Sequence, residues 1–352
     1  MTLPLQFYFE RQDYFDAWQE RARAAKRSID LEMYIFQDDA VGQPFAELLA
    51  VKAQEGVKVR VLYDSVGSRE ASEGLWYMLR ENGVQVQEYH PIFPLPLKLR
   101  RRDHRKILLV DSEVGFLGGF NLMDEDWRDA GVEMSDPRLV GHLQSIFDFS
   151  WEGRRQVLRS LSRKRRLRWG ENGLHLVPSF GLRRLNMIRQ EYLAAIVHAE
   201  KRIDLASAYF VPDRGVLRAL RKAARRGVAV RVMSTGPSDV PMARWASQYY
   251  YSRLLKEGVR IFEFQPRMMH AKTAVVDRCW FTVGTANIDH LSFFHNLELN
   301  LVGRDEAAAR ELEAQFERDL ADSKEINREA WERRPDWRRR RERFWHMFRA
   351  WM

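Results

Sequence analysis

Two stretches of the sequence decide its fold, HRKILLVDSEVGFLGGFN at residues 104–121 and HAKTAVVDRCWFTVGTAN at residues 270–287. In both, a lysine follows a histidine by two residues, an aspartate by seven and an asparagine by seventeen. One such motif arises easily by chance, whereas two copies with the same spacing indicate a repeated functional unit. The matching residues are His104, Lys106, Asp111, Gly119 and Asn121 in the first copy, and His270, Lys272, Asp277, Thr285 and Asn287 in the second.

The sequence before each motif also repeats, in three segments that recur in the same order. A generic buried strand after a helix could produce one such match, but three matches in register predict two copies of one structural unit. The pairs are AKRSIDLEMYIF (25–36) with AEKRIDLASAYF (199–210), QEGVKVRVLYD (54–64) with RRGVAVRVMST (225–235), and ENGVQVQEYHP (81–91) with KEGVRIFEFQP (256–266).

Each copy alternates short runs of Val, Ile, Tyr and Phe with helix-like stretches that end at a glycine, namely Gly56, Gly83, Gly227 and Gly258. This rhythm of strand and helix predicts an α/β fold built from two α/β units. We expect the units to span residues 1–152 and 171–326, with one motif in each. A basic linker would occupy residues 153–170, and a basic, aromatic tail would occupy residues 327–352.

The composition fits a globular protein, with 352 residues, 45% hydrophobic and 30% charged. Its net charge of +9 predicts attraction to polyanions such as nucleic acid or anionic lipid. Cys279 is the single cysteine, which excludes an intramolecular disulfide. The sequence has no secretion signal at its start and no apolar run of membrane-spanning length. We therefore expect a cytoplasmic protein that binds peripherally to the surface of the inner membrane and does not cross it.

The residue types of the two motifs favour phosphodiester chemistry. If ILLVD and TAVVD are strands, the period of two places the histidine and lysine of each copy on one face. An imidazole can attack phosphorus while lysine neutralises the phosphate oxygens, and the small Gly119 or Thr285 lets the backbone and the asparagine amide approach the same anion. A double displacement needs one histidine as nucleophile and a second as acid and base, so both copies would serve one site.

Four carboxylates in or near the two motifs fall into two groups. Asp111 and Asp277 lie an odd number of residues after their histidines, at the strand end or facing away, which favours a turn-forming and orienting role over direct chemistry. Glu298 and Asp129 are better candidates to hold a histidine ring nitrogen and fix its tautomer. The alternative for Glu298 and Asp129 is an ordinary surface carboxylate.

These motifs resemble the phospholipase D superfamily and, within it, the bacterial cardiolipin synthases, here of a type without N-terminal transmembrane helices. The resemblance implies two α/β/α sandwiches related by pseudo-two-fold symmetry around one shared active site, no cofactor or metal, and a covalent phosphatidyl-histidine intermediate. It also implies that His104 is the nucleophile and His270 the acid and base. The resemblance covers nearly the whole chain, through IDLEMYIFQDDAVGQPFAELLA (29–50), RRRDHRKILLVD (100–111), GGFN (118–121), GTANID (284–289) and NLELN (296–300).

The sequence departs from this family at three positions. Gly119 and Thr285 stand where the family often has serine, and Leu291 stands where many of the synthases have arginine, which puts the acceptor in more doubt than the cleavage. The first copy also inserts IFPLPLKLRRRD (92–103) before His104. This insert could dip apolar residues into a bilayer or form an ordinary surface loop.

Two basic segments remain. The run over residues 153–170 has the composition of a solvated linker. In the tail, aromatic residues recur at helical spacing among arginines, which suits a helix at a membrane interface or a helix docked on the protein's own body. The aromatic and apolar residues of this pattern are Trp337, Phe344, Trp345, Phe348, Trp351 and Met352.

Three functions are compatible with these features. The leading hypothesis is a phosphatidyltransferase that makes cardiolipin from phosphatidylglycerol or a similar lipid pair, with an anionic phospholipid membrane as its partner. The alternative is a phospholipase D-type hydrolase or nuclease that applies the same two histidines to nucleic acid. A basic binding protein on a degenerate scaffold is disfavoured because both motifs are intact.

Overall fold

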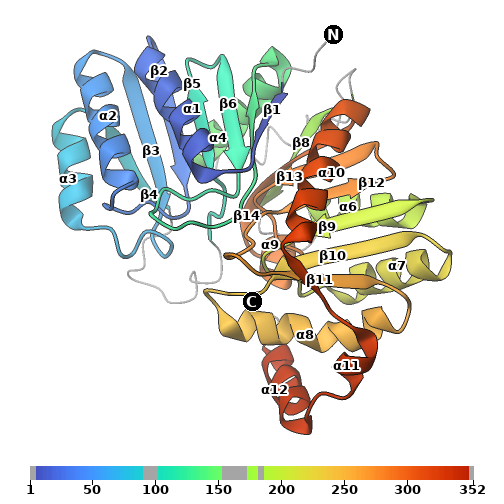
Figure 1. The fold of residues 1–352 in the computed structure, drawn as a ribbon. Helices are drawn as coiled ribbons and strands as arrows, with labels where there is room; N and C mark the ends of the chain where they lie inside the picture. Colours follow the sequence, from blue (N-terminus) through green and yellow to red (C-terminus); the bar gives the residue numbers. More distant parts are fainter. Residues whose placement is uncertain (1–4, 90–101, 153–172, 181–185, 349–352) are drawn as a thin grey trace.

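The computed structural model of the protein describes residues 5–89, 102–152, 173–180 and 186–348 (Figure 1). Two sheets, one from each half of the chain, lie side by side in this structure. The first half contains β1 (Leu5–Tyr8), α1 (Arg11–Ala24), β2 (Ser28–Met33), α2 (Gly42–Gln54), β3 (Lys58–Asp64), α3 (Glu73–Glu81), β4 (Gln85–Tyr89), β5 (Ile107–Val110), β6 (Val114–Gly118), β7 (Gly131–Met134) and α4 (Pro137–Glu152).

The second half repeats this succession and adds elements at its C-terminal end. Its elements are β8 (His175–Phe180), α6 (Met187–His198), β9 (Arg202–Ala206), α7 (Arg214–Arg225), β10 (Ala229–Thr235), α8 (Pro241–Leu255), β11 (Arg260–Phe264), β12 (Thr273–Val276), β13 (Trp280–Gly284), α9 (His290–Phe294), β14 (Leu297–Arg304) and α10 (Glu306–Ala321). Strand β15 (Ser323–Glu325) and helices α11 (Arg328–Glu332) and α12 (Asp336–Met347) follow.

The two sheets have the same strand order. The first runs β1-β7-β6-β5-β2-β3-β4, and the second runs β8-β14-β13-β12-β9-β10-β11, with β15 added at its edge. In each sheet the three strands that alternate with helices pair in parallel, and the other neighbours are antiparallel. The internal repeat of the sequence is thus a repeat of topology.

Matching ion pairs join equivalent strands in the two halves. Asp30 on β2 lies opposite Arg60 on β3, and its two carboxylate oxygens each accept a hydrogen bond of 2.7 Å from that guanidinium. The Arg60 guanidinium also reaches Asp148 on α4 at 2.8 Å. Asp204, Arg231 and Glu317 make the same triad in the second half. These pairs tie each parallel strand pair to the helix that covers one face of its sheet.

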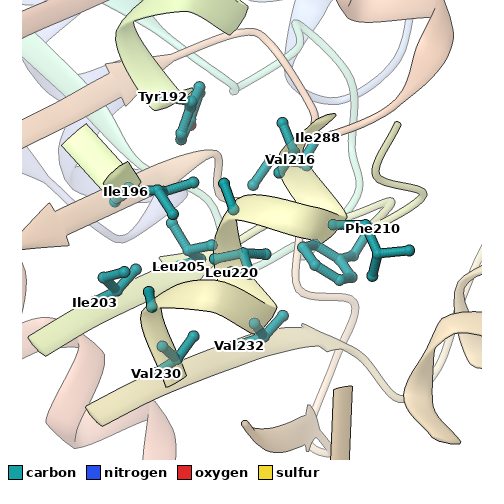
Figure 2. Close-up of a cluster of buried hydrophobic side chains, with 14 of the residues drawn as sticks. Tyr192, Ile196, Ile203, Leu205, Phe210, Val216, Leu220, Val230, Val232 and Ile288 are labelled. Atoms are coloured by element: carbon teal, nitrogen blue, oxygen red, sulfur yellow. The ribbon is translucent and has the colours of Figure 1, made fainter. Parts of the chain in front are cut away.

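Helices cover both faces of each sheet, which confirms the predicted pair of α/β/α layers. Helices α6, α7 and α8 pack on one face of the second sheet through apolar residues such as Ile196, Leu220 and Tyr251. Figure 2 shows part of this cluster, in which Leu220 of α7 lies close to Leu205 and Val232 of the strands. Helices α4 and α10, on the opposite faces, contribute to a single apolar cluster that includes residues of both halves. The shared cluster holds the two sheets together.

The glycines that follow the helices adopt the left-handed backbone conformation. Gly56 and Gly227 both have φ +91°, and Gly83 and Gly258 both have φ +86°. An L side chain is strained at such angles, so glycine ends each helix at the same point in both repeats. No helix in the described part of the chain is both long enough and apolar enough to cross a bilayer.

Candidate active site

Each histidine and lysine pair lies just before a strand, not within it. Strand β5 begins at Ile107 and β12 at Thr273, so the predicted strands are correct but start after the His-x-Lys of each motif. The residues just before each strand pair with the opposite half of the protein, so their backbone stays extended and their side chains still alternate. Asp103 forms a parallel bridge with Leu297, and the backbone N–H of His104 donates to the carbonyl of Leu297 at 3.0 Å.

The second motif is held in the same way by the first half. Arg128 forms a parallel bridge with Met269, and the backbone N–H of His270 donates to the carbonyl of Arg128 at 2.7 Å. Each histidine is therefore positioned at or near the start of a strand of the other half, because Leu297 begins β14 and Arg128 lies shortly before β7. This reciprocal exchange brings the two motifs to one place between the sheets.

The carboxylate of Glu298 holds the ring of His104. Nδ1 of His104 lies 3.0 Å from Oε2 of Glu298, which is fully buried. The hydroxyl of Thr285 donates to the same oxygen, and the amide of Asn296 donates to the other at 3.2 Å. Because an ionised carboxylate only accepts hydrogen bonds, Nδ1 carries the proton, and Nε2 presents its lone pair.

Asp129 holds the ring of His270 in the same manner. Its Oδ2 contacts Nδ1 of His270, and its Oδ1 accepts from the backbone N–H of Ala130 at 2.8 Å. Glycine at 119 makes room for this carboxylate, because a Cβ there would lie 2.1 Å from Oδ1 of Asp129. The departure from serine at this position thus has a steric reason. Both carboxylates that the sequence analysis singled out are buried and contact the histidine of the opposite half.

Burial and nearby charges set the protonation of these groups. Burial lowers the pKa of His104, against the opposing effect of Glu298. Burial and the positive charge of Lys272 lower the pKa of His270 to about 3. Burial alone would raise the pKa of Asp129, but Lys272 and His270 lower it to about 2. At neutral pH, without substrate, the site therefore holds two neutral imidazoles beside two ionised carboxylates.

Both lysines are buried at the same site. Each Nζ donates to the carbonyl oxygen of its own histidine, at 2.7 Å for Lys106. Burial and the charge of Lys272 lower the pKa of Lys106 to about 7, and burial lowers that of Lys272 to about 8. Two buried ammonium groups whose ionisation is disfavoured by burial form a site that an anion would stabilise.

The two asparagines of the motifs, Asn121 and Asn287, are also buried. Within the described residues neither side-chain oxygen has a hydrogen-bond partner. Two aromatic rings that the sequence analysis missed flank the histidines. Tyr34 packs on His104 and Trp127 on His270, each with ring centroids 4.7 Å apart. No periodic pattern marks either residue in the sequence.

The aspartates of the motifs lie in hairpin turns away from the histidines. The carboxylate of Asp111 accepts from the backbone N–H groups of Lys26, Arg27 and Ser28, and it follows the end of β5. The carboxylate of Asp277 accepts in the same way from residues 200–202. Asp111 and Asp277 have φ 55° and 52°, as a tight hairpin requires. This geometry gives them a turn-forming and anchoring position.

A buried charged network supports only the first motif. Arg105, fully buried, lies 3.0 Å from Glu32 and 3.1 Å from Asp103, and the backbone N–H of Asp103 donates to Asp64 at 2.7 Å. Burial raises the pKa of Glu32 well above its usual value and that of Asp64 to about 6. The second motif has Ala271 and Met269 where the first has Arg105 and Asp103. The sequence analysis did not identify this asymmetry.

Some predicted features are not covered by this geometry. The apolar and basic insert before His104 falls on residues 92–103, of which only residues 102 and 103 are described. The linker over residues 153–170 also lies outside the described residues. The described ranges contain no group of three or more His, Cys, Asp or Glu side chains arranged to hold a metal ion.

Comparisons with known proteins agree with the repeat and the fold. The family model described as "Cardiolipin synthase, PLD-like domain" matches residues 19–151 and 192–320. A cardiolipin synthase of Oceanobacillus iheyensis is 33% identical over 339 residues, covering 93% of this chain and 71% of that protein. Cardiolipin synthase 2 of Bacillus anthracis is 35% identical, covering 89% and 64%, and the major cardiolipin synthase of Bacillus subtilis is 34% identical, covering 90% and 69%.

A solved structure shows the same fold at low identity. The phosphatidylserine synthase of Haemophilus influenzae superposes with a TM-score of 0.76 at 16% identity, covering 99% of this chain and 95% of that one. The chain spans between 64% and 71% of the length of the three cardiolipin synthases.

Proposed function

The chain belongs to the cardiolipin synthase family of the phospholipase D superfamily, and on this premise we propose that it is a phosphatidyltransferase. Its donor would be phosphatidylglycerol or a similar phospholipid, its acceptor the hydroxyl of a second such lipid, and its product cardiolipin. The observation that carries this proposal is the crossed arrangement of two carboxylate-held histidines around two buried lysines. A two-step transfer at phosphorus needs such a set, because two bases act on opposite sides of one anion.

In the first step, Nε2 of His104 attacks phosphorus, and the bond from phosphorus to the leaving glycerol oxygen breaks. Nε2–H of His270 gives its proton to that oxygen, so the alcohol leaves uncharged. The phosphatidyl group is then bound covalently to His104. Glu298 accepts the Nδ1–H of His104 and stabilises the positive charge that the ring gains in the attack.

In the second step the proton movements reverse. His270, now neutral, takes the proton of an acceptor lipid hydroxyl, whose oxygen attacks phosphorus and breaks the phosphorus–nitrogen bond. His104 returns to its neutral form, and His270 is protonated for the next turnover. Because the pKa of His270 is about 3 without ligand, the negative charge of the bound phosphodiester must raise it before His270 can act as the acid.

The lysines and asparagines bind the phosphate in this scheme. In this proposal Lys106 and Lys272 neutralise its non-bridging oxygens, and the side-chain N–H groups of the buried Asn121 and Asn287 donate to them. The two halves present nearly equivalent groups. The choice of His104 as nucleophile therefore rests on the resemblance to the family, and trapping the intermediate tests it.

The central experiment follows lipid conversion by the full-length chain. Vesicles that contain labelled phosphatidylglycerol should yield cardiolipin and glycerol in the presence of a chelator, and His104→Ala should abolish the product. His198→Ala is the matched control, because this exposed histidine lies at the end of α6. Acid quenching and peptide mass spectrometry should locate a phosphatidyl adduct on His104.

Other outcomes would contradict the proposal. If the protein cleaves single-stranded DNA and forms no lipid product, it is a nuclease and not a phosphatidyltransferase. Full turnover by His104→Ala would remove the histidine from the mechanism, and an adduct on His270 would exchange the two roles.

We also propose that the enzyme works peripherally on the inner membrane surface, since its substrates are bilayer lipids. The net charge of +9 favours contact with anionic headgroups.

A further inference from the structure

Helix α12 packs on the protein through its ion-paired Glu342 and through the rings of Trp345 and His346. Glu342 is buried against Arg334, whose guanidinium reaches both carboxylate oxygens at 2.8 and 2.7 Å. The ring of His346 stacks on Tyr249 of α8 with centroids 3.8 Å apart. Figure 1 shows α12 lying beside α8, at the outer edge of the second half. This side of the helix holds it against the body of the protein.

The opposite side of α12 is apolar and faces solvent. Trp337 is 56% exposed and Met347 is 65% exposed, and Phe344 and Phe348 are also exposed. These four positions fall on one side of a helix with 3.6 residues per turn, away from Glu342. A helix of a water-soluble protein normally turns its apolar residues inward, so the four exposed apolar side chains on the outer side of α12 depart from that rule.

Arginines without acidic partners surround these apolar side chains. Arg338, Arg340 and Arg343 are exposed, and among the described residues no carboxylate forms an ion pair with them. In the preceding helix α11, by contrast, Arg328 and Arg333 each pair with a glutamate on the same helix. The outer side of α12 therefore combines exposed rings with uncompensated positive charge.

The position of α12 relates this surface to the catalytic groups. Trp345 of α12 packs on Trp245 in the N-terminal part of α8, with ring centroids 6.0 Å apart. The segment just before α8 contains Asp239, whose charge acts on Lys272 of the active site. The docked helix thus contacts α8 at Trp245 and Tyr249, in the helix that directly follows the segment with Asp239.

We propose that the outer side of α12, formed by Trp337, Phe344, Met347 and Phe348 and flanked by Arg340 and Arg343, docks the protein on an anionic phospholipid bilayer. The rings insert at the level of the lipid headgroups, and the guanidinium groups contact lipid phosphates. A bilayer fits this surface better than a protein partner, because the rings project outward from a convex helix and the arginines find their counterions in the headgroup layer. The inference deepens the proposed lipid substrate, although binding can be measured without any turnover.

The test uses the full chain and vesicles of two compositions. Wild-type protein should co-sediment with vesicles of phosphatidylcholine and phosphatidylglycerol, and much less with phosphatidylcholine alone. The variant Trp337→Ser/Phe344→Ser should bind the anionic vesicles on the order of tenfold more weakly, since affinity scales with the apolar area inserted. Arg340→Gln/Arg343→Gln should lose the preference for anionic vesicles. Tyr77→Ser is the matched control, because this aromatic residue of α3 is 66% exposed elsewhere on the surface.

Two further measurements separate docking from folding and catalysis. The thermal midpoints of the variants should match that of the wild type, because the contacts with α8 remain. Turnover of a monomeric, short-chain phosphatidylglycerol should also be unchanged, because no bilayer is involved. If the wild type binds vesicles yet converts no lipid of either kind, the proposed function fails while the docking surface stands.

Three results would overturn the inference. The first is vesicle binding by Trp337→Ser/Phe344→Ser that equals that of the wild type. The second is a wild-type dimer in sedimentation velocity that the same variant dissolves without a change in vesicle binding, which would assign the surface to a second copy of the chain. The third is that the same variant loses binding to single-stranded DNA while its vesicle binding stays intact, which would assign the surface to nucleic acid.

Discussion

At the residue scale, the site depends on small side chains as much as on reactive ones. Asp129 can reach His270 because position 119 carries no Cβ, and Glu298 is held in place partly by the hydroxyl of Thr285. The two equivalent positions thus serve the two carboxylates differently. One leaves space for the shorter aspartate, and the other donates a hydrogen bond to the longer glutamate.

Gly119→Ser should inactivate the enzyme even though serine is frequent at this position in the family. Its Cβ would lie within 2.1 Å of Oδ1 of Asp129, so the carboxylate must move and His270 loses the partner that fixes its tautomer. We expect kcat to fall on the order of 10²-fold or more, measured on monomeric phosphatidylglycerol. Gly141→Ser, on an open surface of α4, is the control and should leave kcat unchanged. Normal kcat for Gly119→Ser would mean that Asp129 is not needed at this position.

At the element scale, each β-hairpin of a motif is anchored to the start of the neighbouring strand, β2 or β9, which runs antiparallel to the first strand of the hairpin. Asp111 accepts three backbone N–H groups from residues 26–28, which lead into β2, while its own backbone adopts a positive φ. The hydrogen bonds favour the ionised carboxylate and, although burial opposes them, they keep the pKa of Asp111 below its usual value. The aspartate that ends the motif thus acts on strand geometry.

Asp111→Asn should therefore reduce stability more than catalysis. The amide can accept at only one of its two former oxygen positions, and the loss should lower the free energy of unfolding by about 1–3 kcal/mol. Urea unfolding measures this change, and kcat per folded molecule should stay within a few-fold of the wild type. Glu113→Gln, an exposed carboxylate in the same hairpin, controls for the charge removed. A large loss of kcat with unchanged stability would place Asp111 in the chemistry instead.

The elements also show what the sequence could predict. The repeat, the α/β alternation and the paired motifs depend on local periodicity and spacing, which a sequence carries directly. The strand starts at Ile107 and Thr273 were predicted correctly from ILLVD and TAVVD, but the pairing of the residues before them with the opposite half is a tertiary contact that the sequence did not reveal. The Glu32–Arg105–Asp103 network arises from tertiary packing and leaves no period in the sequence. The helical spacing of the tail was visible in the sequence, but which side of α12 faces solvent depends on its packing against α8.

At the scale of the whole molecule, charged groups of one half affect the protonation of groups in the other half. Lys106 and Lys272 come from different halves, and the charge of Lys272 contributes to lowering the pKa of Lys106 to about 7. The pKa of Lys272 is about 8, lowered mainly by burial. The empty site therefore begins to lose its positive charge within the neutral range.

We expect kcat/KM for monomeric phosphatidylglycerol to fall as the pH rises through about 7 and 8, the pKa values of the two lysines. Protonated lysine binds the anionic phosphodiester, and the free enzyme loses these charges as the pH passes each pKa. A bound anion raises both pKa values, so kcat should stay constant to higher pH than kcat/KM. Steady-state kinetics at constant ionic strength measures both profiles, and a flat kcat/KM across this window would show that the lysines remain charged in the free enzyme.

Because each half supplies the carboxylate for the other half's histidine, the protein can be catalytically active only when both halves have folded and packed together. A chain in which only one half has folded holds a histidine with no acceptor for its Nδ1 proton, because that acceptor belongs to the unfolded half. Neither half can therefore act on a phosphodiester by itself, and a nascent or damaged molecule stays inert until both sheets have met. The two copies therefore depend on each other, since a change at the carboxylate of one repeat disables the histidine of the other.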